Sequence, residues 1–243
     1  QLESAIKPHT RLIFLNTPSN PTGSMYSPEE LEALAAVLRK HPEVYVISDE
    51  IYEYITFGKA HKSFGTLEGM YDRTITVNGF SKGFAMTGWR LGYIAAPKAI
   101  AKMCEKLQGQ CTSGANAFAQ MGAVAALTED LAPTMSMRDT FLERRDMMYT
   151  KLKAIPGVEV NLPDGAFYFY PDLVSFLGKN TPSGQKLETI SELCLYLIES
   201  EGLAVVPGDA FGTESHIRIS YAYAEEVLID ALGRLERALG QLS

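Results

Sequence analysis

Short apolar runs and helically spaced apolar positions alternate along the first hundred residues. Four runs of apolar and β-branched residues predict strands over 12–15, 44–47, 74–77 and 91–95. Between the first two runs, Ser27, Pro28 and Glu30 form a helix start with a capping box. Leucine and alanine recur at helical spacing from there to residue 38, and His41-Pro42 ends the helix.

Continuous apolar strands separated by helices favour the α/β class, with a largely parallel sheet covered on both faces. In such sheets ligands collect at the carboxyl ends of the strands. Asp49 and Lys82 each follow such an end closely. We therefore expect chemistry at these two positions.

The pattern becomes helical from about Pro97, with helices expected over 115–127 and 140–155, the second linking two domains. The last hundred residues predict an α+β layer of a different kind. Its expected strands are 158–160, 166–169, 203–206 and 216–220, and its expected helices are 187–200 and 224–239, with a turn at 163–165 and an exposed loop at 178–184. This division predicts one domain over 1–145 and a smaller one over 146–243.

Composition narrows the range of functions. The net charge of −7 and a pI near 5.2 argue against a nucleic-acid surface. No apolar run approaches the roughly 20 residues that span a bilayer, so no membrane partner is expected. The three cysteines and four histidines lack metal-ligand spacing, which predicts no metal and reduced thiols in a cytoplasmic protein.

Three segments and one arginine carry the candidate chemistry. The first two are Asn20-Pro21-Thr22-Gly23 and Ser48-Asp49-Glu50-Ile51-Tyr52, and the third runs from Asn78 to Arg90 around Lys82. Arg218 lies alone in an apolar strand, between Ile217 and Ile219. Together, and in this order, they resemble the class I and II aminotransferases that use pyridoxal 5′-phosphate (PLP), most closely the aspartate aminotransferases.

The resemblance covers nearly the whole chain and implies the fold of the PLP-dependent transferases (fold type I). Residues 1–145 would be the C-terminal part of the PLP-binding large domain, and 146–243 the small C-terminal domain. The family carries a long segment upstream of the first predicted strand. The sequence is therefore expected to be the C-terminal part of a larger enzyme, or a truncated form of it.

Lys82 is the expected catalytic residue. The resemblance makes it the amine that forms a Schiff base with PLP and then the general acid and base for the substrate proton. A lysine attacks only when it is neutral, which requires desolvation or nearby positive charge. Taken alone, Lys82 would be a solvated surface lysine, and its neighbours reverse that interpretation.

The remaining cofactor contacts follow from the same resemblance. Asp49 would hold the pyridine nitrogen protonated, Asn20 and Tyr52 would donate to the phenolic oxygen, and Arg90 would hold the phosphate. Simpler interpretations stay open: a helix cap for Asp49, a core tyrosine for Tyr52, a plain turn for Asn20 and a surface salt bridge for Arg90.

One position departs from the family pattern. Many members carry a serine three residues before the lysine, where this chain has Gly79, and Ser81 could substitute for it as a phosphate ligand. Glu50 and Glu53 are interpreted as neighbours without a site role.

Arg218 is the candidate for the substrate. Ile217 and Ile219 face one side of the strand, and Arg218 faces the other, where an unpaired charge is costly. A substrate carboxylate and a structural ion pair are both suitable partners. The resemblance favours the α-carboxylate, with Asn20 as the second substrate-binding residue.

The expected function is transfer of an amino group from an L-amino acid, aspartate by preference, to 2-oxoglutarate in amino acid metabolism. The resemblance also implies a homodimer. Another fold type I activity, such as an aromatic aminotransferase or a carbon–sulfur lyase, remains open, as does a non-catalytic piece of such an enzyme.

Overall fold

A computed structural model describes all residues, 1–243. Its internal contacts divide the chain into two compact units. The first consists of residues 1–19 and 24–138, and the second of residues 20–23 and 139–243.

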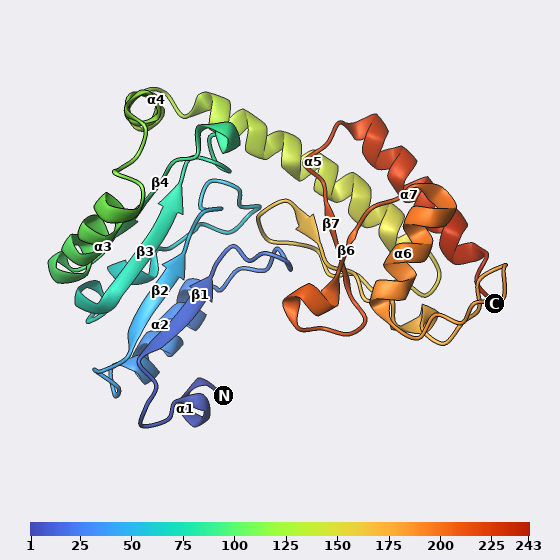
Figure 1. The fold of residues 1–243 in the computed structure, drawn as a ribbon, viewed down its shortest axis with the longest axis horizontal. Helices are drawn as coiled ribbons and strands as arrows, with labels where there is room; N and C mark the ends of the chain where they lie inside the picture. Colours follow the sequence, from blue (N-terminus) through green and yellow to red (C-terminus); the bar gives the residue numbers. More distant parts are fainter. The chain divides into compact units, whose positions relative to one another are not determined.

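A four-stranded sheet forms the centre of the first unit, in the order β1 (Leu12–Asn16), β2 (Tyr45–Asp49), β3 (Thr74–Gly79) and β4 (Gly92–Ala95) (Figure 1). The first three strands are parallel, and β4 runs antiparallel to β3. Asp49 pairs in register with Asn16 on one side and Val77 on the other. The prediction of a largely parallel sheet is therefore confirmed, with one antiparallel edge strand.

Helix α2 (Pro28–Leu38) packs on the sheet and forms its main core. The predicted capping box is present, because Ser27 accepts from the Glu30 N–H and Glu30 accepts from the Ser27 N–H. Leu31, Ala35 and Leu38 are buried against β1 and β2. The short helix α1 (Leu2–Ala5) contacts α2, and Leu2 packs against the edge of this core.

A buried arginine closes the C-terminal end of α2. The guanidinium of Arg73 donates to the carbonyl oxygens of Leu38 and His41. The Leu38 carbonyl also accepts a hydrogen bond from the His41 N–H, and the His41 carbonyl accepts one from the Val44 N–H. Arg73 therefore adds a second donor to each of these two carbonyls, at and just past the end of the helix.

The opposite face of the sheet is open, so the prediction of cover on both faces is wrong for this chain. The side chain of Phe14 in β1 is 73% exposed, and every residue of β4 is exposed. Helix α3 (Lys98–Cys111) buries none of its residues, and α4 (Ala117–Thr128) buries only Ala119 and Ala123. The apolar runs predicted the strands correctly, but they did not indicate which helices would cover each face of the sheet.

The second unit combines helices with a small antiparallel sheet. Its strands, in the order β5-β7-β6, are Tyr168–Phe169, Ile217–Ser220 and Val206–Pro207. Aromatic rings of Phe141, Phe167, Phe169 and Tyr221 pack together in its core. Helices α6 (Ile190–Glu201) and α7 (Glu225–Gly240) pack against each other.

Several predicted boundaries shift. Helix α5 (Ala132–Ala154) begins eight residues before the expected start, because Asp130 caps the Ala132 N–H and Pro133 suits the first turn. Residues 158–160 form only an isolated bridge between Glu159 and Asp172. Short 3-10 helices complete the structure at Phe64–Thr66, Tyr71–Arg73, Thr87–Trp89, Val174–Phe176 and Gly208–Phe211.

None of the helices is long and apolar enough to cross a bilayer. The structure also contains no group of three or more histidine, cysteine or acidic side chains arranged to hold a metal ion.

The three thiols should differ in reactivity. Burial raises the pKa of Cys194 to about 12, whereas Cys104 and Cys111 are exposed. A thiol reagent at pH 8 should therefore label two cysteines of the folded chain quickly and the third only on unfolding, because the thiolate is the reactive form. Mass spectrometry of labelled peptides would measure this. Rapid labelling of Cys194 in the folded chain would contradict the placement of α6.

Candidate functional site

Asp49 is the last residue of β2 and lies at the carboxyl edge of the sheet. Its backbone carbonyl accepts from the Thr17 N–H at 3.1 Å and from the Asn16 amide at 3.2 Å. Its carboxylate accepts one hydrogen bond, from the Ile51 N–H at 3.2 Å. The backbone is thus fixed by the neighbouring strand, while the carboxylate keeps most of its capacity to accept.

Burial raises the pKa of Asp49, and the charge of Glu50 adds to this effect, while the hydrogen bond from Ile51 opposes it. Burial destabilises the charged form of this carboxyl, so a cationic N–H donor beside it would offset part of that cost.

Tyr52 follows Asp49 on a tight turn. The Glu53 N–H donates to the Glu50 carbonyl, and the Ile55 N–H donates to that of Tyr52. Tyr52 is only 3% exposed. Its side chain is therefore buried in the core near the end of β2.

Lys82 lies on the turn after β3, the strand next to β2. Two backbone hydrogen bonds close this turn. The Ala85 N–H donates to the Lys82 carbonyl, and the Met86 N–H donates to the Phe80 carbonyl. Lys82 and Ser81 are partly buried there. The predicted position of the lysine at a strand end is therefore observed.

The turn after β2 and the turn after β3 touch. The ring of Tyr54 packs edge-on against Phe84, with their centroids 5.2 Å apart. A Cβ at Gly83 would lie 2.8 Å from the Tyr54 ring, so only glycine allows this contact without a shift. The segment with Asp49 and Tyr52 and the segment with Ser81 and Lys82 thus form one surface at adjacent strand ends.

The glycine that departs from the family pattern has a packing reason. A Cβ at Gly79 would lie 3.0 Å from the Cα of Gly92 and 3.0 Å from the carbonyl oxygen of Leu91. Both contacts are backbone atoms of the β4 side, which cannot move aside easily. A serine at this position would therefore require β3 and β4 to separate.

Arg90 is exposed and has left-handed backbone angles, with φ 53°. Its Nη1 donates to the Thr87 carbonyl at 2.9 Å. This bond holds the guanidinium close to the 3-10 turn that precedes it. The surface salt bridge left open by the sequence does not form in this chain, since no acidic side chain pairs with Arg90.

In the second unit, Arg218 lies in β7 between two aromatic rings. Its guanidinium carbon is 4.7 Å from the centroid of Tyr168 and 5.1 Å from that of Phe211. Nη1 donates to the Asn20 side-chain oxygen at 2.9 Å, and the buried Nε has no hydrogen-bond partner. No acidic side chain pairs with Arg218, so the structural ion pair considered from the sequence is absent.

Asn20 belongs to the second unit through the segment 20–23. The Gly23 carbonyl accepts from the N–H groups of Asp164 and Gly165, both at 2.9 Å. A Cβ at Gly23 would lie 2.6 Å from that of Pro163. The segment is thus tied to the predicted turn at 163–165, and this contact places Asn20 on Arg218.

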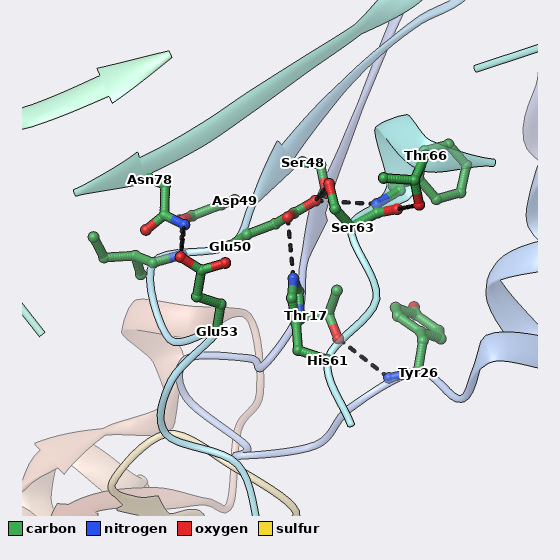
Figure 2. A network of polar contacts seen from close by, with 12 residues as sticks. Thr17, Tyr26, Ser48, Asp49, Glu50, Glu53, His61, Ser63, Thr66 and Asn78 are labelled. Carbon is green, nitrogen blue, oxygen red and sulfur yellow. Dashed lines mark hydrogen bonds and ion pairs between the residues drawn. The ribbon is translucent and has the colours of Figure 1, made fainter. Parts of the chain in front are cut away.

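Sequence reasoning missed the buried network around Glu50 (Figure 2). The Glu50 carboxylate accepts from Ser48 Oγ at 2.7 Å, Ser63 Oγ at 3.0 Å and the Phe64 N–H at 3.1 Å. His61 Nε2 lies 3.0 Å from its other oxygen. Glu53 likewise accepts from Asn78 at 2.8 Å. The signal was an acidic residue directly after a buried strand, followed by His61 and Ser63.

The raised pKa of Asp49 predicts that Asp49→Asn stabilises the ligand-free chain. Ionising a carboxyl whose pKa is raised in the folded state costs stability as the pH rises above its ordinary value of 3.8. The melting temperature of Asp49→Asn at pH 7 should exceed that of the wild type by roughly 1–2 °C, and the gain should vanish below about pH 4. Thermal unfolding at both pH values measures this, with Asp72→Asn at the surface as control. A lower melting temperature at pH 7 would contradict it.

Comparison with known proteins identifies the family of this chain. The family model for aminotransferase class I and II matches residues 1–235. A Petunia hybrida protein named as a bifunctional aspartate aminotransferase and glutamate/aspartate-prephenate aminotransferase is 48% identical over 98% of the chain and 50% of its own length. A Pinus pinaster aspartate aminotransferase is 45% identical over 97% of the chain and 49% of its own length. The chain thus spans about half the length of these relatives.

Solved structures of aminotransferases resemble this chain over nearly its whole length. The aspartate aminotransferase of Rhizobium meliloti superimposes with a TM-score of 0.96 at 42% identity, covering 100% of this chain and 61% of that one. An aromatic aminotransferase from Pyrococcus horikoshii gives 0.90 at 37% identity, covering 98% and 62%. The chain therefore belongs to the class I and II aminotransferases and has the PLP-dependent transferase fold of that family.

Proposed function

We propose that this chain carries the lysine-bearing part of a PLP-dependent aminotransferase, and that the whole protein moves an amino group from an L-amino acid, aspartate first, to 2-oxoglutarate. The observation that carries the proposal is the contact between the turns after β2 and β3. It brings an acid of raised proton affinity and a partly buried lysine to adjacent strand ends.

The residues of the first unit suit PLP. Asp49 would accept from the protonated ring nitrogen, Tyr52 would donate to the phenolic oxygen, and Ser81 and Arg90 would hold the phosphate. The Asp49 carboxylate makes only one hydrogen bond inside the chain, so its capacity matches a ring N–H donor. When bound, PLP acts as an electron sink that stabilises negative charge on the substrate α-carbon.

The chain's own residues would then divide the work. The Lys82 amine would be released from the cofactor by the substrate amine, and would then remove the α-proton and deliver a proton to the cofactor carbon on the other side of the shared nitrogen. Asp49 would keep the ring nitrogen charged throughout. In the second unit, Arg218 would bind the substrate α-carboxylate, for which its buried and unpartnered Nε is a ready donor, and Asn20 would orient it and donate to the phenolic oxygen.

We further propose that residues 1–145 form the C-terminal part of the PLP-binding large domain and residues 146–243 the small domain. The family resemblance also supports a cytoplasmic homodimer that acts in amino acid biosynthesis.

Prephenate as amino acceptor is a second candidate function, because the Petunia relative and one from Rhizobium leguminosarum carry that activity in their names. Assays with aspartate, tyrosine and cystathionine as substrates, and with 2-oxoglutarate and prephenate as acceptors, would separate these activities from a carbon–sulfur lyase.

Lys82 should be the only residue that PLP modifies under reducing conditions. After incubation with PLP and borohydride, the peptide with Lys82 should gain a pyridoxyl group, and Lys82→Ala should gain none. Amino transfer by the whole protein should fall by about 10³-fold or more, since both nucleophile and general base are lost. The exposed Lys102→Ala is the control and should behave as the wild type. A wild-type chain that takes up no PLP would favour the interpretation as a non-catalytic piece.

Arg218→Lys should weaken binding of the substrate more than it slows chemistry. Lysine lacks the planar fork and the two-ring stacking, so the KM for the amino acid should rise by about 10- to 100-fold, with a smaller change in kcat. Steady-state kinetics measures both. Arg237→Lys, which alters an exposed pair with Glu201, should leave KM unchanged. An unaltered KM in Arg218→Lys would remove Arg218 from the substrate site.

A further inference from the structure

Glu50 is a buried carboxylate that the proposed chemistry does not use. It is 1% exposed and lies directly after Asp49. Its backbone N–H donates to the Val77 carbonyl of β3 at 2.9 Å. An acidic side chain at such a position is costly unless it is fully hydrogen-bonded.

Four groups satisfy the Glu50 carboxylate. Ser48 comes from β2 itself, and the other three, His61, Ser63 and the Phe64 N–H, come from one short segment further along the chain (Figure 2). Burial raises the pKa of Glu50, but the hydrogen bonds from His61, Ser48 and Ser63 outweigh this, and the pKa lies below its ordinary value. Glu50 is therefore charged at neutral pH and holds its four partners by charge-assisted hydrogen bonds.

These bonds close the chain between Glu50 and Phe64 into a loop. The loop contains Tyr52, and Asp49 stands at its start. Its middle is held separately, by the bond from Asn78 to Glu53 and by the packing of Tyr54 on the Lys82 turn. The contacts of Glu50 with His61, Ser63 and Phe64 tie the far end of the loop back to the end of β2.

We propose that Glu50 is a positioning residue for the cofactor: its charged carboxylate clasps residues 61–64 to the end of β2, and so fixes Asp49 and Tyr52 relative to each other for contact with the PLP ring. This inference rests on the proposed function. It assigns to Glu50, His61 and Ser63 a role that neither the sequence pattern nor the relatives' names provide.

The test uses Glu50→Ala, which removes the clasp, and Glu50→Gln, which keeps its shape. A glutamine can still accept from Ser63 and Phe64 and can donate to His61. Glu43→Gln is the matched control, because the exposed Glu43 lies 3.8 Å from the partly buried His41 in another acid–histidine pair. Leu31→Ala, a core variant, controls for simple loss of stability.

Three readouts are needed. The first is amide hydrogen exchange of residues 51–60 in the chain without PLP. The second is the dissociation constant of PLP, measured by absorbance. The third is the pH midpoint of the bound cofactor's absorbance, measured by titration. Exchange should accelerate about tenfold or more in Glu50→Ala, and PLP affinity should fall by a similar factor. The pH midpoint should rise by about half a unit or more, because a displaced Asp49 holds less positive charge on the ring.

Glu50→Gln should recover most of the affinity, and neither control should move the pH midpoint. If Glu50→Ala does not fold, Ser63→Ala removes one contact of the clasp and should shift all three readouts in the same direction by a smaller factor. Faster exchange with wild-type PLP affinity and pH midpoint in Glu50→Ala would overturn the inference and leave the proposed function standing. A wild-type protein that binds no PLP would overturn both.

Discussion

The register of three parallel strands is the constraint on which the first unit depends. Because β1, β2 and β3 pair in parallel, their carboxyl ends meet at one edge, and Asp49 lies between Asn16 and Val77. A shift of one residue would turn Val46 and the other core side chains away from α2, so packing enforces the register. The same packing therefore sets the position of Asp49 and the start of the Lys82 turn.

Two adjacent carboxylates at this edge have opposite environments. Successive residues of an extended chain point to opposite sides. Glu50 meets four hydrogen-bonding groups and has a lowered pKa, whereas Asp49 meets one N–H and has a raised pKa. A carboxylate whose hydrogen-bond donors all come from the chain, like that of Glu50, suits a structural clasp. A carboxylate that can still accept further hydrogen bonds, like that of Asp49, suits a ligand that supplies the remaining donors.

The elements that the sequence predicted well are those with local causes. The capping box at Ser27 and the strand ends at Asp49 and Lys82 depend on residues close together in the chain. Errors arose where the cause is distant. The Glu50 network needs a segment eleven to fourteen residues away to return, and the open face at Phe14 depends on which helices pack there. The steric limit on Gly79 comes from β4, which runs antiparallel to β3, and the apolar run at 91–95 did not predict that direction.

Arg218 shows how a partly buried charge can be held without an acid. The faces of Tyr168 and Phe211 offer negative quadrupoles to the guanidinium, and Asn20 accepts one of its N–H groups. These contacts offset part of the cost of burial but leave Nε without a partner. A buried N–H donor without a partner is unfavourable, and a carboxylate that accepted from Nε would remove that cost, which supports the proposed role of Arg218. A local acidic partner would have removed that driving force, which is why its absence is informative.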